Sequence, residues 1–233
     1  MKIKSAFTMI ELVFVIVILG ILASLSMERL DRDLRQEAAT SVLSHIRLAK
    51  QLALNDNKHR SDNDARWQRA YWEWRYRVCA NGDIFYMVRS DLNLNSAFAQ
   101  NESAIDPATG KYLFLPVAGA NGYCNNRSNK GNNNLNKVAL TEEFGINNIN
   151  RRGGCATGAT RQYISFDYLG RPHHGRNGYA SAGTAHFDNI MTQDCNLDFT
   201  LSTDQDGDGN DDTFTIRIEA ETGHAFIVGQ ASS

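Results

Sequence analysis

The sequence predicts an α+β protein. A long N-terminal helix, apolar in its first half and amphipathic in its second, is expected to pack on an antiparallel β-sheet head with elaborated loops. Residues 7–55 repeat apolar side chains at helical spacing without a proline. Segments near 72–88 and 197–227 alternate apolar and polar side chains, as strands with one buried face do. At 233 residues, the chain has room for one head plus an extension.

The helix is expected to run unbroken from Phe7 to about Asn55, which at 1.5 Å per residue gives about 70 to 75 Å. Its first half, residues 7–27, is apolar on every side, whereas residues 28–58 form an amphipathic half with one apolar stripe. The stripe residues are Leu30, Leu34, Ala38, Val42, Ile46, Ala49 and Ala53, and the charged residues off the stripe are Arg32, Arg35, Glu37, Arg47 and Lys50.

The head is expected to occupy residues 59–233. The range 72–78 predicts a first strand because charged side chains alternate with Trp72, Trp74, Tyr76 and Val78, which would form its buried face. Asn81-Gly82 predicts a hairpin turn, and residues 84–88 predict the returning strand. Residues 163–168, 197–202 and 213–220 predict three more strands, and the segment "ETGHAFIV" a last turn and strand.

The stretch from about 90 to 150 is rich in Asn, Gly and Ser and low in pattern. It predicts an elaborated loop region within the head rather than a second domain. Short strands are expected only near Tyr112 to Val117.

The N-terminal segment carries a charge that an ordinary export signal does not need. Lys2 and Lys4 precede the apolar run, but Glu11 stands where this run begins. A carboxylate costs about 2.5 to 3.5 kcal/mol at the centre of a membrane helix and less near its end, so an ionic partner is expected. A conventional signal peptide or an uncleaved anchor would explain the lysines and the apolar run, but neither explains the stretch "FTMIE".

The stretch Ala6-Phe7-Thr8-Met9-Ile10-Glu11, with its basic leader and apolar tail, resembles the prepilin signal of type IV pilins and type II secretion pseudopilins. The resemblance implies that a membrane prepilin peptidase removes residues 1–6 by cutting between Ala6 and Phe7 and methylates the new amino terminus. The apolar segment would be retained, and Glu11 would be neutralised by the amino terminus of the neighbouring subunit during assembly. Ala6 departs from the glycine that the family most often has there.

The resemblance further implies a minor pilin or pseudopilin subunit of a type II secretion or type IV pilus-like filament. Its partners would be other pilin or pseudopilin subunits and the inner-membrane assembly machinery. Before assembly the chain would span the inner membrane once with its head in the periplasm, and afterwards it would be part of a periplasmic or extracellular filament. The segments "ISFDYLGRP" and "FTIRIEAETGHAFIV" are placed in a way that is similar to heads of H-type minor pseudopilins.

Four cysteines, Cys79, Cys124, Cys155 and Cys195, lie in the head. Exported domains with an even number of cysteines usually pair them, and four cysteines allow three connectivities. Two disulfides are expected, with Cys124–Cys155 bridging the loop region. Thiolate metal binding is not expected because the chain has no C-x-x-C motif and no suitably spaced histidine.

An enzyme is not expected, because the sequence has no G-x-S-x-G, H-E-x-x-H or P-loop motif. A DNA-binding minor pilin of a DNA-uptake pilus is the alternative function. Residues 124–176 contain eight Lys or Arg and three acidic residues, whereas residues 181–233 contain one Arg and ten acidic residues. The basic segment, which includes Arg151 and Arg152, could attract phosphates, dock a partner subunit or be solvated.

Calcium is the expected cofactor, in the acidic loop between the two strands at 197–202 and 213–220. Oxygen-bearing side chains recur there at alternate positions, and Gly209 stands sixth from the first of them, where a D-x-D-x-D-G calcium loop needs its glycine. Asp198 or Glu219 could add an oxygen, because Thr215 stands where an EF-hand has its glutamate. A merely solvated turn is the alternative. The expected ligands are Asp204, Asp206, Asp208, Asn210 and Asp212.

Overall fold

The computed structural model describes seven stretches of the chain, with side chains everywhere except at residues 23–33. The stretches are 9–56, 70–92, 99–117, 122–156, 162–174, 189–202 and 211–230.

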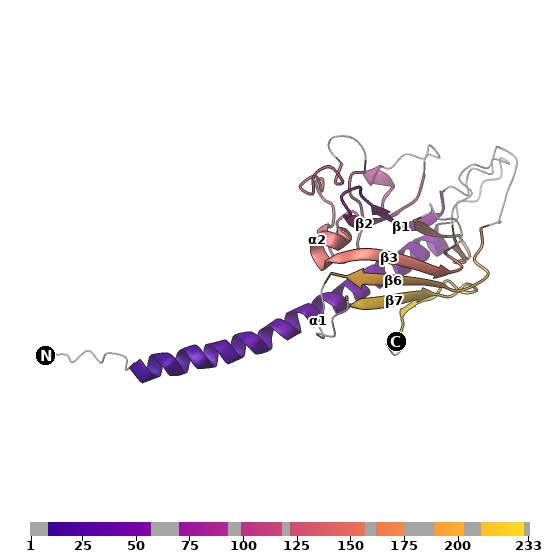
Figure 1. Ribbon diagram of the computed structural model, residues 1–233. Coiled ribbons are helices and arrows are strands. Elements are labelled where there is room, and N and C mark those ends of the chain that lie inside the picture. The colour runs from indigo at the N-terminus through magenta and orange to yellow at the C-terminus, as the bar shows by residue number, and fades with distance from the viewer. Residues whose placement is uncertain are drawn as a thin grey trace, which may run out of the picture.

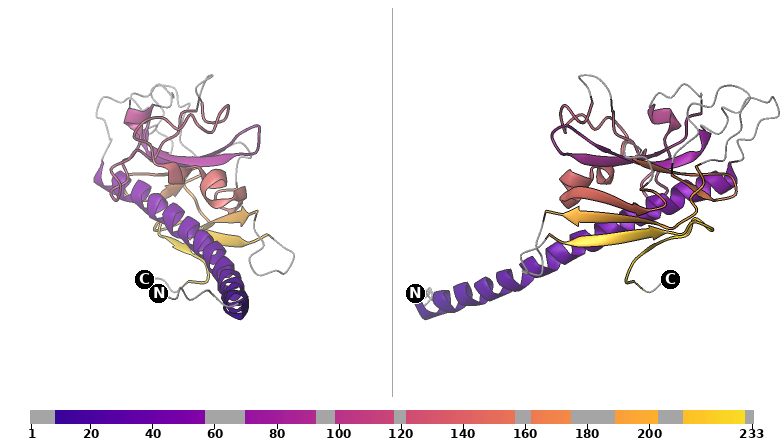
Figure 2. Two further views of the ribbon diagram at one scale, coloured as in Figure 1. Left: turned by 90° about the vertical axis from the view of Figure 1, so that its left-hand side faces the viewer. Right: turned by 45° about the vertical axis from the view of Figure 1, so that its right-hand side comes forward.

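One helix, α1 (Met9–Asn55), forms the N-terminal part of the described chain and has 47 residues. It is about 70 Å long at 1.5 Å per residue. Its first part projects away from the head, and its second part runs along the head across the strands of both sheets (Figure 1, Figure 2). The predicted unbroken helix is therefore confirmed over the described residues.

Two four-stranded antiparallel sheets form the head. The first has the order β2-β1-β4-β5, and the second has the order β3-β6-β7-β8. Short helical turns, η2 (Gln100–Glu102), η3 (Asn136–Val138) and α2 (Leu140–Phe144), lie between β2 and β3. The strands are β1 (Trp72–Val78), β2 (Ile84–Arg89), β3 (Ile146–Gly153), β4 (Tyr163–Phe166), β5 (Pro172–His173), β6 (Cys195–Leu201), β7 (Thr213–Ile218) and β8 (Ala225–Ile227).

The core lies between the second part of α1 and both sheets. The predicted apolar stripe is buried from Ala38 onward, where Val42 and Ile46 have no exposed surface. Alanines at 38, 49 and 53 allow the helix backbone to approach the sheets closely because their side chains are small. Leu34 departs from the prediction, since it is 36% exposed and lies before the helix reaches the head core.

Aromatic side chains join the two sheets. Trp74 on β1 meets Phe199 on β6 edge to face, with ring centroids 6.4 Å apart. Phe199 in turn stacks on Phe214 of β7 at 4.7 Å. The two sheets therefore share one core, which fits the fold class predicted from the sequence.

Both faces of the first strand, β1, contribute a buried side chain, which the alternating pattern did not predict. Trp74 and Tyr76 are buried as expected, but Val78 is 47% exposed at the strand end. Glu73, on the opposite face, is buried because its carboxylate accepts a 2.6 Å hydrogen bond from Nε of buried Arg89 on β2. An ion pair across two strands thus takes the place of solvent on that face.

The region from 90 to 150 contains more regular structure than predicted. Strand β3 and helix α2 lie at its end, and the strands expected near residues 112–117 are wrong. In that range the structure has only isolated bridges, at Tyr112. Apolar and polar side chains do not alternate regularly along β3, so the sequence pattern did not reveal this strand. Its pairing with β6 is irregular between Ile146 and Asn148, and the buried apolar side chains are Ile146 and Ile149, three residues apart.

All four cysteines form disulfides, as predicted, but the pairing is Cys79–Cys124 and Cys155–Cys195. The expected Cys124–Cys155 bridge is wrong. Cys155 lies two residues after Gly153, whose partner in the β3–β6 ladder is Cys195, so strand pairing selects this partner. Cys124 instead ties the loop region to Cys79, which directly follows β1.

Candidate assembly site

The first part of α1 presents an apolar surface to its surroundings. Every large apolar side chain described from Met9 to Leu22 is exposed, between 43% for Ile18 and 87% for Met9. A helix that is apolar on all sides is stable only when lipid or protein surrounds it. This segment is therefore a candidate surface for insertion or assembly.

Glu11 lies in the first turn of α1 and its side chain is exposed. Apolar side chains precede and follow it along the helix, so a neighbouring helix that covered this surface would also cover the carboxylate. Burial without a cation would be costly, which makes Glu11 a register point for such a neighbour. The helix N-terminus also favours a negative charge at this position.

The predicted cleavage residues, Ala6 and Phe7, lie outside the described residues. Among the helices whose side chains are described, none is both long and apolar enough to cross a membrane.

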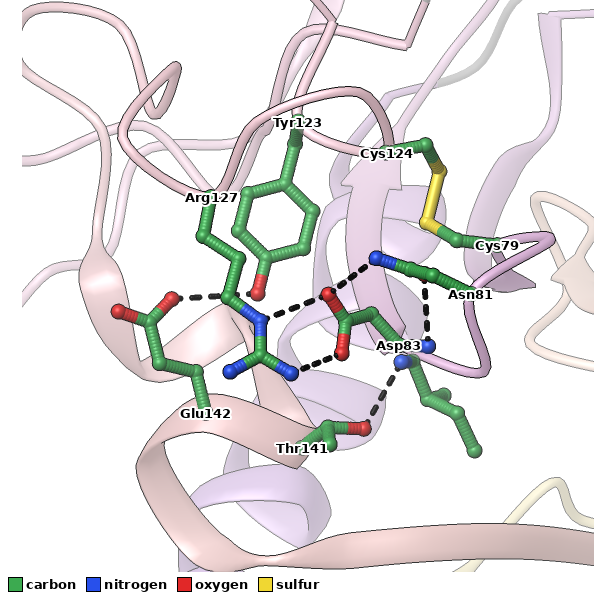
Figure 3. Close-up of a disulfide and its surroundings, with 9 residues drawn as sticks. Cys79, Asn81, Asp83, Tyr123, Cys124, Arg127, Thr141 and Glu142 are labelled. Carbon is green, nitrogen blue, oxygen red and sulfur yellow. Dashed lines mark hydrogen bonds and ion pairs between the residues drawn. A yellow bond between two sulfur atoms is a disulfide. The ribbon is translucent and has the colours of Figure 1, made fainter.

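A disulfide and an ion pair join the β1–β2 turn to the loop region of the head (Figure 3). The Cys79–Cys124 bridge lies beside Asp83, whose carboxylate is almost fully buried and receives Nε and Nη2 of Arg127. Asn81 donates a further hydrogen bond to this carboxylate, and the backbone N–H of Asp83 donates to the Asn81 side chain.

These contacts hold the pKa of Asp83 below its usual range, chiefly through the hydrogen bond from Arg127. The carboxylate is thus ionised whenever the head is folded at neutral pH. Sequence reasoning missed this pair, because 44 residues separate its members. The sequence signal that could have pointed to Asp83 was the turn Asn81-Gly82-Asp83, because an Asn side chain in a turn often accepts a hydrogen bond from the backbone N–H two residues later.

Five of the six described basic residues between 124 and 176 are paired with carboxylates of the same chain. Arg152 donates two hydrogen bonds to Asp198, at 2.5 Å and 2.8 Å. Arg151, the other predicted nucleic-acid contact, lies near Tyr76, where its charge opposes the increase in the tyrosine pKa that burial causes. Four further basic residues of the segment are paired as Arg127–Asp83, Lys130–Glu142, Lys137–Glu37 and Arg171–Asp167.

The predicted calcium loop falls mostly outside the described residues, which do not include Asp204, Asp206, Asp208 or Asn210. Asp212, the fifth proposed ligand, is 7% exposed, and its Oδ1 lies 3.5 Å from Nη1 of Arg35 on α1. Within the described stretches, no group of three or more His, Cys, Asp or Glu side chains could hold a metal ion.

The two residues considered as extra calcium ligands are placed differently by the fold. Asp198 already accepts hydrogen bonds from Arg152 and Thr215. Glu219 follows β7 at the end opposite to Asp212, about 20 Å away along a six-residue strand. Glu219 is therefore distant from Asp212, the one proposed loop ligand among the described residues.

Comparison with known families finds a match to the start of the chain. Residues 1–27 match the prokaryotic N-terminal methylation motif, the signature of the prepilin-type signal of type IV pilins and pseudopilins. No curated protein and no solved structure matches the chain significantly. The motif supports a pilin-like subunit that is made as a membrane-anchored precursor and processed by a prepilin peptidase.

Proposed function

We propose that this chain is a minor pilin or pseudopilin subunit of a type II secretion or type IV pilus-like filament. One observation carries the proposal. The methylation motif at residues 1–27 covers the start of α1, whose described side chains from Met9 to Leu22 are exposed and mostly apolar, and this part of the helix projects from the head. Such a helix supplies an anchor before assembly and a packing surface within a filament afterwards.

The mechanism is assembly without catalysis. After cleavage before Phe7, the apolar part of α1 would leave the lipid for the filament core, and Glu11 would pair with the cationic amino terminus of the neighbouring subunit. Because a mismatched register would bury an unpaired carboxylate, this pair would align each new subunit. The inner-membrane anchor, the periplasmic head and the role as a minor subunit belong to this proposal. The two disulfides support it, since disulfides persist in an oxidising compartment.

The experiment that tests this function is mass spectrometry of the mature chain, combined with a filament incorporation assay. We expect an N-methylated Phe7 terminus. Glu11→Ala or Glu11→Val should leave cleavage largely intact but reduce incorporation strongly. Glu37→Ala is the matched control on the same helix, because Glu37 pairs with Lys137 of its own head. A mature chain that begins near Met27, or one that retains Met1, would contradict the proposal.

The DNA-binding alternative gains no support from the head geometry. A groove for nucleic acid needs cations that can release counterions from phosphates. Five basic side chains of the segment instead contact carboxylates of the same chain. We therefore favour a role in subunit contact.

A further inference from the structure

A groove of about 410 Å³ runs along the head half of α1. One wall is a single face of the helix, from Thr40 to Gln51, and the opposite wall comes from β8 and the turn at Pro107. The helix positions are 40, 43, 44, 47, 48 and 51, a spacing that places them on one face over about three turns. The groove thus has the length and form of a docking site for another helix.

The helix wall of the groove allows close approach of another helix backbone. Thr40 and Ser44 are small and stand four residues apart, as in interfaces where helices pack closely. Their hydroxyls are satisfied locally, because Thr40 donates to the carbonyl of Gln36 and Ser44 to that of Ser41. Leu43, Leu48 and Phe226 add apolar surface around them. The helix wall therefore offers packing area, and its two hydroxyls do not need hydrogen bonds from an occupant.

Arg47 gives the groove its charge. Its Nε donates a 2.9 Å hydrogen bond to the carbonyl of Ala225 on β8, which fixes the guanidinium at the groove wall. Within the described residues, this carbonyl is the only acceptor that the guanidinium contacts, so the remaining N–H groups can serve an occupant. Among the side chains that the structure describes, no acidic one lines the groove.

Arg47 differs in this respect from many arginines of the head. Several of those find a carboxylate of their own chain, as in the pairs Arg35–Asp212, Arg89–Glu73, Arg127–Asp83, Arg152–Asp198, Arg171–Asp167 and Arg217–Asp194. A fixed arginine whose partner is a neutral carbonyl, in an apolar groove, is complementary to a carboxylate carried by the occupant.

We propose that this groove binds the helical stem of the adjacent filament subunit, that is, the part of its long helix that follows the apolar segment. This stem would present an Asp or Glu side chain to Arg47. The inference rests on the proposed function, because subunits whose apolar helices pack side by side bring the following stems into parallel contact. The groove lies on the same helix as the candidate assembly surface, farther along the stem. Binding in this groove would extend the contacts between subunits from the filament core to the head. It would also favour a neighbouring subunit that carries an acidic side chain opposite Arg47.

The experiment is site-specific photo-crosslinking in cells, with a benzophenone amino acid replacing Ser44 in the full-length chain. We expect a single crosslinked product, and mass spectrometry of the joined peptides should place the partner end within the acidic stem of a filament subunit. Arg47→Glu should lower its yield about tenfold, the effect of losing roughly one charge-assisted hydrogen bond. Changing the identified partner carboxylate to Lys should restore the yield with Arg47→Glu.

Two further variants make the result decisive. Lys111→Glu applies the same charge change on an exposed residue outside the groove and should keep the yield. Arg47→Gln removes the positive charge and the guanidinium donors without adding a negative charge, and it should also lower the yield. Protease resistance and both disulfides report whether each head is folded. Crosslinks to lipid, to a non-filament protein or to the head surface of a neighbour would overturn the inference, as would an unchanged yield with Arg47→Glu. If incorporation still depends on Glu11 in that case, the proposed function stands and only the groove inference fails.

Discussion

At the scale of single residues, the head stabilises its buried polar groups by pairing them across elements. His45 on α1 is 5% exposed. Its Nδ1 lies 2.5 Å from the hydroxyl of Tyr86 on β2, and its Nε2 lies 3.7 Å from Asp106. Burial lowers the pKa of His45 below its usual value, and the nearby Asp106 carboxylate offsets this only in part. The imidazole is therefore neutral in the folded head at neutral pH.

This residue predicts a pH dependence of stability. The unfolded chain binds a proton at His45 near pH 6.5, whereas the folded head binds it only at lower pH. The contribution to the free energy of unfolding is thus complete above pH 6.5 and declines as the pH falls from there towards the lowered pKa. Thermal unfolding of the mature chain in detergent should show this decline, and His45→Gln should flatten it.

The carboxylates provide the internal control for this prediction. The pKa values of Asp83, Asp106, Asp167, Asp194 and Asp198 are all lowered from 3.8. Their contributions are present above that value and are lost only as the pH falls further, so they leave the window just below pH 6.5 to histidine. An identical pH profile for His45→Gln and the parent chain would contradict the assignment to His45.

At the scale of elements, strand ends depend on backbone conformations that only glycine adopts easily. Gly153 ends β3 with φ at +75°, and a Cβ there would lie 2.0 Å from the carbonyl oxygen of Asp194. Gly82, in the β1–β2 turn, has φ at +88°, but a Cβ there would have no atom of the described residues within 4 Å. The two glycines share the positive φ and differ in space, which separates backbone strain from steric overlap.

Gly82→Ala should therefore cost about 1 to 2 kcal/mol, the strain of a left-handed residue. Gly153→Ala should cost about 2 to 5 kcal/mol, because overpacking adds roughly 1 to 3 kcal/mol to the same strain. The displaced Asp194 also binds Arg217 and the N–H of Ala220. Denaturant unfolding of both variants measures the difference, and equal costs would show that the Asp194 backbone yields freely.

The β6–β7 connection is the element in which calcium is proposed. Asp212, the last proposed ligand, is paired with Arg35, so a bound ion would have to rely on Asp204, Asp206, Asp208 and Asn210 or compete for Asp212. We expect calcium in the range of about 10⁻⁴ to 10⁻³ M to raise the unfolding midpoint. Asp206→Ala should abolish that shift, whereas Asp194→Ala, in an acidic residue outside the loop, should keep it. No shift with millimolar calcium against chelator would indicate a solvated turn.

Sequence patterns predicted the elements whose period is local. The α1 stripe from Ala38 to Ala53, the Asn81-Gly82 hairpin and the β6–β7 pair each follow from spacing within one segment. Contacts that join distant segments were not predictable in this way, as the Cys79–Cys124 pairing and the Asp83–Arg127 pair show. The assembly segment was predictable because its signal is contiguous, whereas Arg47 became a candidate only when β8 and Pro107 formed a wall beside it.

At the scale of the whole molecule, the chain consists of the projecting first part of α1 and a head that includes the second part of the same helix. The described core begins at Ala38 on α1 and includes no side chain from residues 9–22. Among the described side chains, contacts between α1 and the outer head begin at Arg35, Gln36 and Glu37, which bind Asp212, Gln230 and Lys137. The boundary between assembly segment and head therefore lies before residue 35.

A fragment that starts at Leu34 should fold as a soluble monomer with both disulfides, because it keeps these contacts and the whole α1 stripe from Ala38 onward. A fragment that starts at Ser44 should lose at least about 3 kcal/mol, since it lacks Val42 and Leu43, and each buried aliphatic side chain contributes about 1.5 to 3 kcal/mol. Both side chains are at most 9% exposed in the head. Light scattering and denaturant unfolding of the two fragments provide the measurement. Aggregation of the longer fragment would mean that the apolar part of α1 belongs to the head fold, and equal stability would mean that residues 34–43 do not.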